Sequence, residues 1–136
     1  MSGHENVVGI YLRKMMRLLA KPKHDFSKVS LNEVPKSSGV YAIYDKKLDK
    51  IVYVGRTKNL KRRLLGYHKR GNIEGSQFRK ALGRHLDLST ENEITRYITE
   101  KCSFQFIQIQ DFEEIVRFEH FIIAIIAPIL NVKLRQ

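Results

Sequence analysis

The sequence has 136 residues, 43% of them hydrophobic, which predicts one compact domain with its own core. Its 25 lysines and arginines outnumber 14 acidic residues, and the formal net charge of +11 indicates a polyanionic partner. The alternative is a basic surface that only keeps the protein soluble.

A single cysteine, Cys102, excludes an intramolecular disulfide and favours a reducing compartment. The longest apolar run, residues 121–130, is too short to cross a bilayer. We therefore expect a soluble, cytoplasmic protein that does not contact membranes.

Hydrophobic residues recur at helical spacing between Val7 and Ala20, which predicts a helix. Residues 21–38 contain prolines and polar residues and are expected to connect this helix to the first strand. We divide the chain into an N-terminal helix with its connecting segment, residues 1–36, and a main region, residues 37–136. We expect the helix to cover the sheet; the alternative is an additional basic contact with nucleic acid.

Residues 39–44 and 51–55 are rich in β-branched and aromatic side chains and predict a β-hairpin. After Gly55 the periodicity becomes helical, with Asn59 or Thr57 as the N-cap. Cationic side chains are concentrated around the hairpin and this helix: Lys46, Lys47, Lys50, Arg56, Lys58, Lys61, Arg62, Arg63, Lys69 and Arg70.

Two helical patterns follow, the first capped by Ser76 and the second by a capping box of Thr90 and Glu93. Alternation over residues 103–110 predicts a third strand. The last helix, residues 112–127, has Asp111 as its N-cap, begins with acidic residues and becomes almost wholly apolar, so we expect it to be buried.

The sequence Gly-Val-Tyr at residues 39–41, followed by Tyr-Val-Gly at residues 53–55 and by Arg63 in the next helix, resembles the GIY-YIG nuclease superfamily. This superfamily includes homing endonucleases, restriction enzymes and excision-repair nuclease domains. The resemblance continues with Glu119 on a later helix and Asn131 near the end, and covers most of the chain.

The resemblance implies the GIY-YIG fold, an α/β (α+β) domain with a central three-stranded, mostly antiparallel sheet flanked by helices. It also implies a metal-dependent endonuclease that hydrolyses phosphodiester bonds of nucleic acid, with DNA favoured over RNA. The catalytic residues that it implies are Tyr41, Tyr53, Arg56, Arg63, Tyr67, Glu119 and Asn131.

We expect Tyr41 to take a proton from the attacking water, or to orient it, if the neighbouring cations lower its pKa. The alternative is that Tyr41 and Tyr53 are ordinary core residues of a hairpin. Arg63 suits bidentate contact with the scissile phosphate, and Arg62 is the alternative one position away.

Arg56 stands where the repair-nuclease relatives have a lysine, and we interpret it as a phosphate clamp because arginine does not readily deprotonate. Tyr67 matches a position held by histidine in homing endonucleases and tyrosine in repair nucleases, and is expected to hydrogen-bond the phosphate or the nucleophile. By the same resemblance, Glu119 binds Mg²⁺ (or Mn²⁺); the alternative is a salt bridge with an arginine. Asn131 is expected to fix the geometry of the site.

His68 invites a role as general base, but we expect it to face another side of the helix from the catalytic residues. The residues expected to bind nucleic acid are Lys58, Lys61, Arg62, His68, Lys69 and Arg70.

Two further alternatives are a nucleic-acid-binding module on the same fold with little or no cleavage activity, and a basic interaction domain without enzymatic function. The combination of Tyr41, Tyr53, Arg63 and Glu119 favours the enzyme, because a purely binding domain has no use for a metal-binding carboxylate in a basic site.

Overall fold

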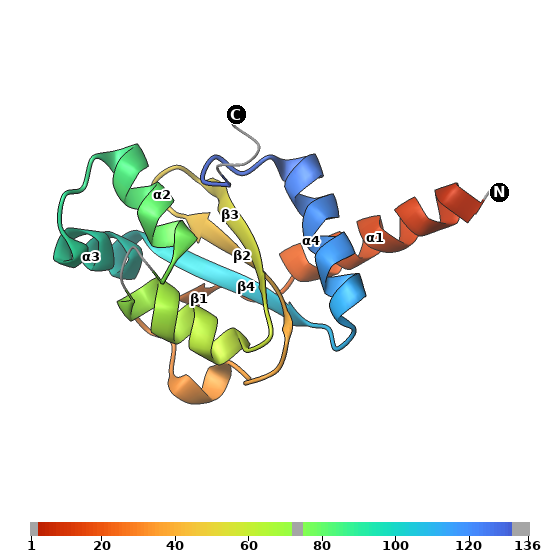
Figure 1. Ribbon diagram of the computed structural model, residues 1–136, viewed down its shortest axis with the longest axis horizontal. Coiled ribbons are helices and arrows are strands. Elements are labelled where there is room, and N and C mark those ends of the chain that lie inside the picture. Colours follow the sequence, from red (N-terminus) through yellow and green to blue (C-terminus); the bar gives the residue numbers. More distant parts are fainter. Residues whose placement is uncertain (1–2, 72–74, 132–136) are drawn as a thin grey trace.

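The computed structural model describes residues 3–71 and 75–131, which form a mixed α/β fold around one antiparallel sheet (Figure 1). The strands lie in the order β1-β4-β2-β3, so that β3 forms one edge. The strands are β1 (His24–Asp25), β2 (Gly39–Asp45), β3 (Lys50–Thr57) and β4 (Cys102–Gln108). The helices are α1 (Gly3–Leu19), η1 (Leu31–Glu33), η2 (Arg62–His68), α2 (Gln77–Leu86), α3 (Glu91–Lys101) and α4 (Phe112–Ile126), of which η1 is a 3-10 helix and η2 is π-helical.

The predicted fold class is confirmed, and the three expected strands β2, β3 and β4 form the centre of the sheet with antiparallel pairing. The two-residue strand β1 extends this sheet to four strands, although it lies in a segment that we expected only to connect. The next residue, Phe26, is fully buried against the Phe104 ring of β4, and this packing holds the connecting segment against the sheet.

Helices cover both faces of the sheet. Alternate residues of β2 point to opposite faces, so Tyr41 and Ile43 join a core with η2, α2 and α3, whereas Val40 and Ala42 join a core with α1 and α4. Figure 1 shows α1 and α4 beside each other, with α1 projecting beyond α4. The described helices include none that is long and apolar enough to span a bilayer.

The hairpin of β2 and β3 contains an irregularity that the sequence pattern does not predict. Ile43 is opposite Tyr53 whereas Tyr44 is opposite Ile51, so Val52 is an extra residue in β3. As a result, the Tyr53 ring lies on the same face of the sheet as Tyr41, with the ring centres 6.4 Å apart.

The predicted helix caps are confirmed for Ser76, for the Thr90 capping box and for Asp111. The expected burial of the last helix is only partly correct, because Ile125 near the end of α4 is 59% exposed. One face of α1 packs against α4 through residues such as Tyr11, which agrees with a covering role.

Candidate active site

A cleft of about 540 Å³ lies along β3, between η2 on one face of the sheet and α4 on the other. Side chains from both sides of the sheet reach it: Tyr41, Tyr53, Arg63 and Tyr67 from the face of η2, and Glu119 from α4. The fold therefore brings residues 78 positions apart, from Tyr41 to Glu119 (119 − 41 = 78), to one place.

Both motif glycines are required by close packing. Gly55 is opposite Tyr41 in the sheet, and a Cβ atom at Gly55 would overlap the phenol ring of Tyr41. A Cβ atom at Gly39 would overlap the backbone carbonyl of Ile107 in β4. The glycine of the second strand therefore makes room for the tyrosine of the first.

The hydroxyl of Tyr41 shares a hydrogen bond of 2.5 Å with Nε2 of His68, and Nδ1 of His68 lies 2.6 Å from Oγ of Ser76. The Ser76 hydroxyl also accepts the backbone N–H of Arg79, because Ser76 caps α2. The neutral imidazole satisfies both of its nitrogens in either tautomer, donating through one and accepting through the other.

Burial sets the charge state of these groups. It raises the pKa of Tyr41 well above the ordinary value, and the neighbouring Arg63 does not reverse this effect. Burial and the Glu119 carboxylate raise the pKa of Tyr53 to about 12, and burial together with Arg63 lowers the pKa of His68 to about 3. The condition for Tyr41 to take a proton, a pKa lowered by the neighbouring cations, is therefore not met, since loss of hydration outweighs their attraction.

The expectations for His68 are also corrected. Its side chain is 1% exposed and points at Tyr41, so it neither faces another side of the helix nor is available to contact nucleic acid. The helix is π-helical from Arg62 to His68, and this wider turn was not predicted from the apolar spacing.

Helix α2 fixes the end of the helix that carries His68. Arg79 is fully buried, and its guanidinium donates to the backbone carbonyls of His68 and Lys69, each at 3.2 Å. It also contacts Glu91 and Thr95 of α3, with N–O distances of 3.0 and 2.9 Å to their side chains. Sequence reasoning missed Arg79 because nothing in a basic helical segment indicates which arginine points inward.

Arg63 contacts the cleft with an unpaired guanidinium. Its Nε atom is buried without a hydrogen-bond partner, and the side chain makes no ion pair with any residue in the described ranges. Arg62 donates a hydrogen bond of 2.7 Å to the Tyr67 hydroxyl, and the guanidinium carbons of Arg62 and Arg63 each lie 5.3 Å from the centre of the Tyr67 ring. Both arginines line the cleft, but Arg63 is the one beside Tyr41 and Tyr53, where its charge opposes, without reversing, the rise that burial causes in the pKa of each tyrosine.

Arg56 and Glu119 form an ion pair across the edge of the sheet, with 2.6 Å between Nη1 and Oε1. The salt bridge weighed in the sequence analysis as the alternative for Glu119 is therefore present. The other carboxylate oxygen, Oε2, has no hydrogen-bond partner among the described residues. Glu119 thus retains one free oxygen in a cleft where its side chain is 9% exposed.

Asn131 completes the edge of the sheet. Its side-chain amide accepts the N–H of Val54 at 3.0 Å and donates to the carbonyl of the same residue at 2.9 Å. These two bonds replace those of a neighbouring strand, so Asn131 fixes β3 beside Tyr53 and Gly55.

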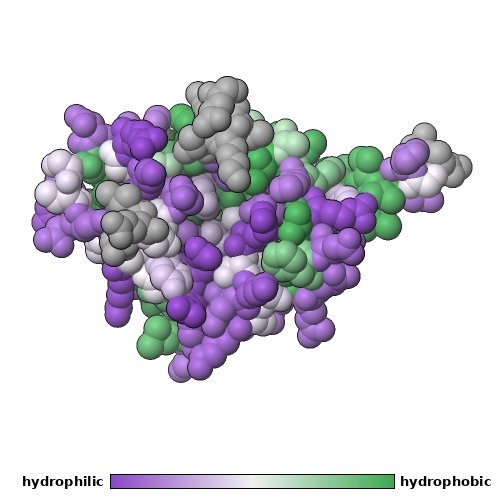
Figure 2. All heavy atoms as spheres, in the orientation of Figure 1, coloured by the Kyte–Doolittle hydropathy of each residue, from purple (hydrophilic) through white to green (hydrophobic). Residues whose placement is uncertain are grey.

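The cations that we expected to bind nucleic acid are not all in the cleft. Lys58 and Arg62 line it, whereas Lys61, Lys69 and Arg70 do not. Among the residues that the structure describes, four cationic side chains line the cleft against the single carboxylate of Glu119: Arg56, Lys58, Arg62 and Arg63. Figure 2 shows this face as mostly hydrophilic between α2 and α4. Gln77 and Phe112 also line the cleft and were missed, because neither stands out in the sequence as more than a helix-starting residue.

The sequence matches the GIY-YIG catalytic domain family over residues 9–136, and none of the curated proteins matches it. The N-terminal GIY-YIG endonuclease domain of UvrC from Thermotoga maritima, bound to magnesium, is 22% identical with a TM-score of 0.46; the alignment covers 76% of this chain and 98% of that one. A Tyr-to-Phe variant of the same Thermotoga maritima domain, bound to its catalytic divalent cation, is 21% identical with a TM-score of 0.46, covering 76% and 98%. Because the family match extends over nearly the whole sequence, this chain belongs to the GIY-YIG catalytic domain family of nucleases.

Proposed function

We propose that this protein is a metal-dependent endonuclease that hydrolyses phosphodiester bonds, with DNA as the favoured substrate. The observation that carries the proposal is the unpaired guanidinium of Arg63, which shares one cleft with Tyr41, Tyr53 and the Glu119 carboxylate. The Arg63 side chain is half-buried, and its buried Nε–H lacks an acceptor among the described residues, which is costly; a bound phosphate would supply the missing partner.

The substrate phosphate is positioned by the arginines. The Arg63 guanidinium donates hydrogen bonds to two phosphate oxygens in a bidentate contact. The Tyr67 hydroxyl, which accepts a hydrogen bond from Arg62, offers a further donor. Charge that develops on the phosphoryl oxygens during attack then meets cations that are already in place, which lowers the barrier without reorganisation.

The donor atoms in the cleft fit a hard divalent cation. Glu119 offers the free Oε2, and water and phosphate oxygens would complete the coordination, as is usual for Mg²⁺. No cluster of three or more His, Cys, Asp or Glu residues that could bind a metal occurs in the described ranges, which disfavours a site made of protein ligands alone. When bound, the cation would stabilise charge on the phosphate and lower the pKa of water.

Tyr41 orients the attacking water in this proposal. The phenol is neutral because its pKa is raised, and its hydroxyl is held by His68, so its direction is fixed before substrate binds. An imidazole whose pKa is about 3 is too weak a base to accept a proton near neutral pH, so we assign His68 to positioning the Tyr41 hydroxyl.

One observation favours the binding module as a second candidate. The Arg56 guanidinium already satisfies one oxygen of Glu119, so the carboxylate has a structural role without any metal. In that case the cleft would bind phosphate and cut nothing.

Cleavage assays with Glu119→Gln distinguish the two candidates. Labelled DNA and RNA are incubated with the wild type and the variant in Mg²⁺, in Mn²⁺ and in chelator. The nuclease requires metal-dependent products from the wild type and a loss of about a hundredfold or more in the variant, with gel-shift affinity largely retained. A wild type that shifts nucleic acid but cuts none of it in either metal establishes the binding module instead.

A further inference from the structure

Phe112 is the one phenylalanine that the fold leaves in solvent. All seven phenylalanines lie in the described ranges, and the other six are buried or half-buried, whereas Phe112 is 47% exposed. It stands at the first position of α4, directly after the N-cap Asp111, and its ring lines the same cleft as Arg63 and Glu119. Exposed apolar side chains are common on protein surfaces, but this ring lines a cleft beside cationic side chains, where a bound ligand can contact it.

The residues around the Phe112 ring are of the kind that bind a nucleotide. Nζ of Lys58 lies 5.2 Å from the centre of the Phe112 ring, and no carboxylate in the described ranges pairs with this lysine. Arg62 and Asn59 line the same cleft. A phosphate bound to these cations carries its base only one sugar away, within reach of the exposed ring.

We propose that Phe112 is a stacking platform for a nucleobase that is not stacked in a duplex, next to the phosphate held in the cleft. A base in a continuous duplex has both faces covered by its neighbours, so only a single-stranded or extruded nucleotide presents a free face to the ring. The inference rests on the proposed function, which it deepens by naming the substrate class: single-stranded or locally unpaired nucleic acid.

Removing the base from the oligomer and the ring from the protein, separately and together, tests the stacking contact. Binding of a short oligothymidylate is compared with binding of an abasic oligomer of equal length and charge, for the wild type and for Phe112→Ala, with cleavage blocked by chelator. The wild type should bind the thymidylate more tightly than the abasic oligomer, and Phe112→Ala should weaken thymidylate binding by roughly 5- to 150-fold while leaving abasic binding nearly unchanged. Phe112→Leu, which keeps an apolar side chain but no ring, should resemble Phe112→Ala.

A fluorescence measurement gives an independent readout. The protein contains no tryptophan, so Phe112→Trp introduces a single indole at the proposed platform. Met16→Trp is the matched control, because Met16 is 61% exposed on α1 and does not line the cleft. Stacking should change the emission of the Phe112→Trp protein on adding thymidylate, but not on adding the abasic oligomer, and the control should respond to neither.

The possible failures are distinguishable. Equal weakening of both oligomers by Phe112→Ala, or an unchanged emission at saturating thymidylate, overturns the platform and leaves phosphate binding in the cleft intact. Equal affinity of the wild-type protein for a thymidylate strand and for a blunt duplex of the same length also overturns the choice of an unstacked base. If neither oligomer binds and no nucleic acid is cut, the proposed function itself fails.

Discussion

At the residue scale, Tyr41 combines burial with a fixed hydroxyl. Its side chain is 2% exposed, its ring rests over Gly55, and His68 holds its oxygen from inside the core. The raised pKa keeps the phenol neutral near neutral pH, so its hydroxyl can orient a water molecule but carries no charge to activate it.

Tyr41→Phe should lower the cleavage rate by roughly 10² at saturating enzyme, because the hydroxyl that orients the attacking water is removed while the ring still fills its place. The variant should also lose about 1–3 kcal/mol of stability, since Nε2 of buried His68 loses its partner. Single-turnover rates and urea denaturation measure the two effects.

Two other tyrosines provide controls for Tyr41→Phe. The Tyr53 hydroxyl has no hydrogen bond within the described ranges, so Tyr53→Phe should be nearly neutral in stability. Tyr11 is remote on α1, and Tyr11→Phe should leave the cleavage rate unchanged. A Tyr41→Phe protein that cuts at the wild-type rate would show that Tyr41 serves packing alone.

His68 should make stability depend on pH on the acidic side. Its pKa is lowered from 6.5 to about 3 in the folded protein, so below about pH 6.5 the unfolded chain binds a proton that the folded chain does not. The free energy of unfolding should therefore fall as pH decreases, by up to about 1.4 kcal/mol per pH unit from this residue, until pH reaches about 3.

His68→Gln provides the comparison, because its amide retains polar atoms for Tyr41 and Ser76 and does not titrate. Urea denaturation of both proteins between about pH 7 and pH 5, where carboxylates scarcely titrate, isolates the histidine. If the free energy of unfolding changes equally with pH in the two proteins, the His68 side chain is exposed to water and not buried.

At the element scale, β3 positions the site through a glycine, an extra residue and a polar edge. The extra residue at Val52 turns Tyr53 towards Tyr41, Gly55 admits the Tyr41 ring, and Asn131 occupies the outer hydrogen bonds of Val54. Each feature acts on a different stretch of the strand, so the geometry depends on all three.

Gly55→Ala should cost about 1–3 kcal/mol of stability and most of the cleavage activity, because its Cβ would displace the Tyr41 ring. Gly66→Ala in η2 is the matched control, since a Cβ atom there meets nothing within 4 Å and its backbone φ is not positive. Melting temperature and cleavage rate together test this, and a stable, active Gly55→Ala protein would refute the packing argument.

The sequence predicts elements whose signals are local. Alternation, turn residues and caps such as Ser76 and Asp111 indicate where strands and helices begin, and the structure confirms them. The motif residues also predict that Tyr41 and Glu119 share a site, although this comes from resemblance and not from periodicity.

The features that sequence reasoning missed depend on contacts between distant elements. The inward direction of His68 depends on Ser76 at the start of α2, and the burial of Arg79 depends on its contacts from α2 with η2 and α3. The π-helical turn likewise has no local signal in the apolar spacing. The sequence suggests a lowered pKa of Tyr41 as a possibility because the neighbouring cations are visible in it, whereas the burial that raises this pKa is not.

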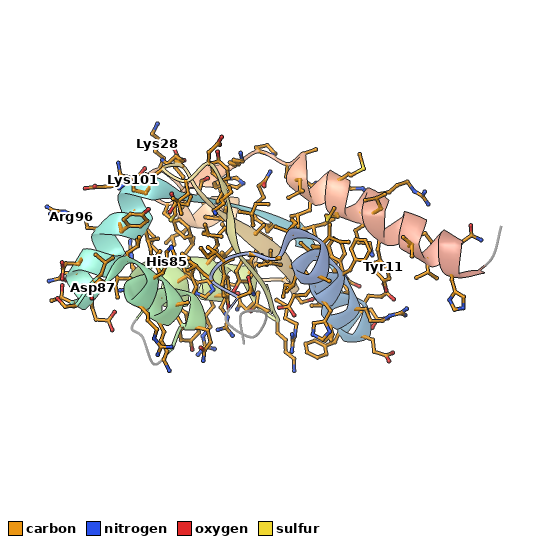
Figure 3. All side chains as sticks on the ribbon, turned by 90° about the horizontal axis from the view of Figure 1, so that it is seen from above. Tyr11, Lys28, His85, Asp87, Arg96 and Lys101 are labelled. Atoms are coloured by element: carbon orange, nitrogen blue, oxygen red, sulfur yellow. The ribbon has the colours of Figure 1, made fainter. Side chains whose placement is uncertain are left out.

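At the scale of the whole molecule, only part of the excess positive charge lies in the cleft. Of the described residues, four cations and one carboxylate line the cleft, while other cations do not reach it. Figure 3 shows Lys28 pointing outward on the side away from α4. The net charge of +11 therefore overstates the number of phosphates that the site can neutralise.

Binding of duplex DNA in the presence of chelator should weaken linearly on a plot of log K against log salt, because each neutralised phosphate releases condensed counterions. Lys58→Gln removes a cleft cation that has no ion pair in the described ranges, so it should reduce the steepness by about 0.9 as well as lowering affinity. Lys28→Gln makes the same change of charge on an exposed lysine outside the cleft, and should leave the slope unchanged. Fluorescence anisotropy at several salt concentrations measures all three proteins. Equal slopes for Lys58→Gln and Lys28→Gln would mean that the whole basic surface, and not the cleft, meets the phosphates.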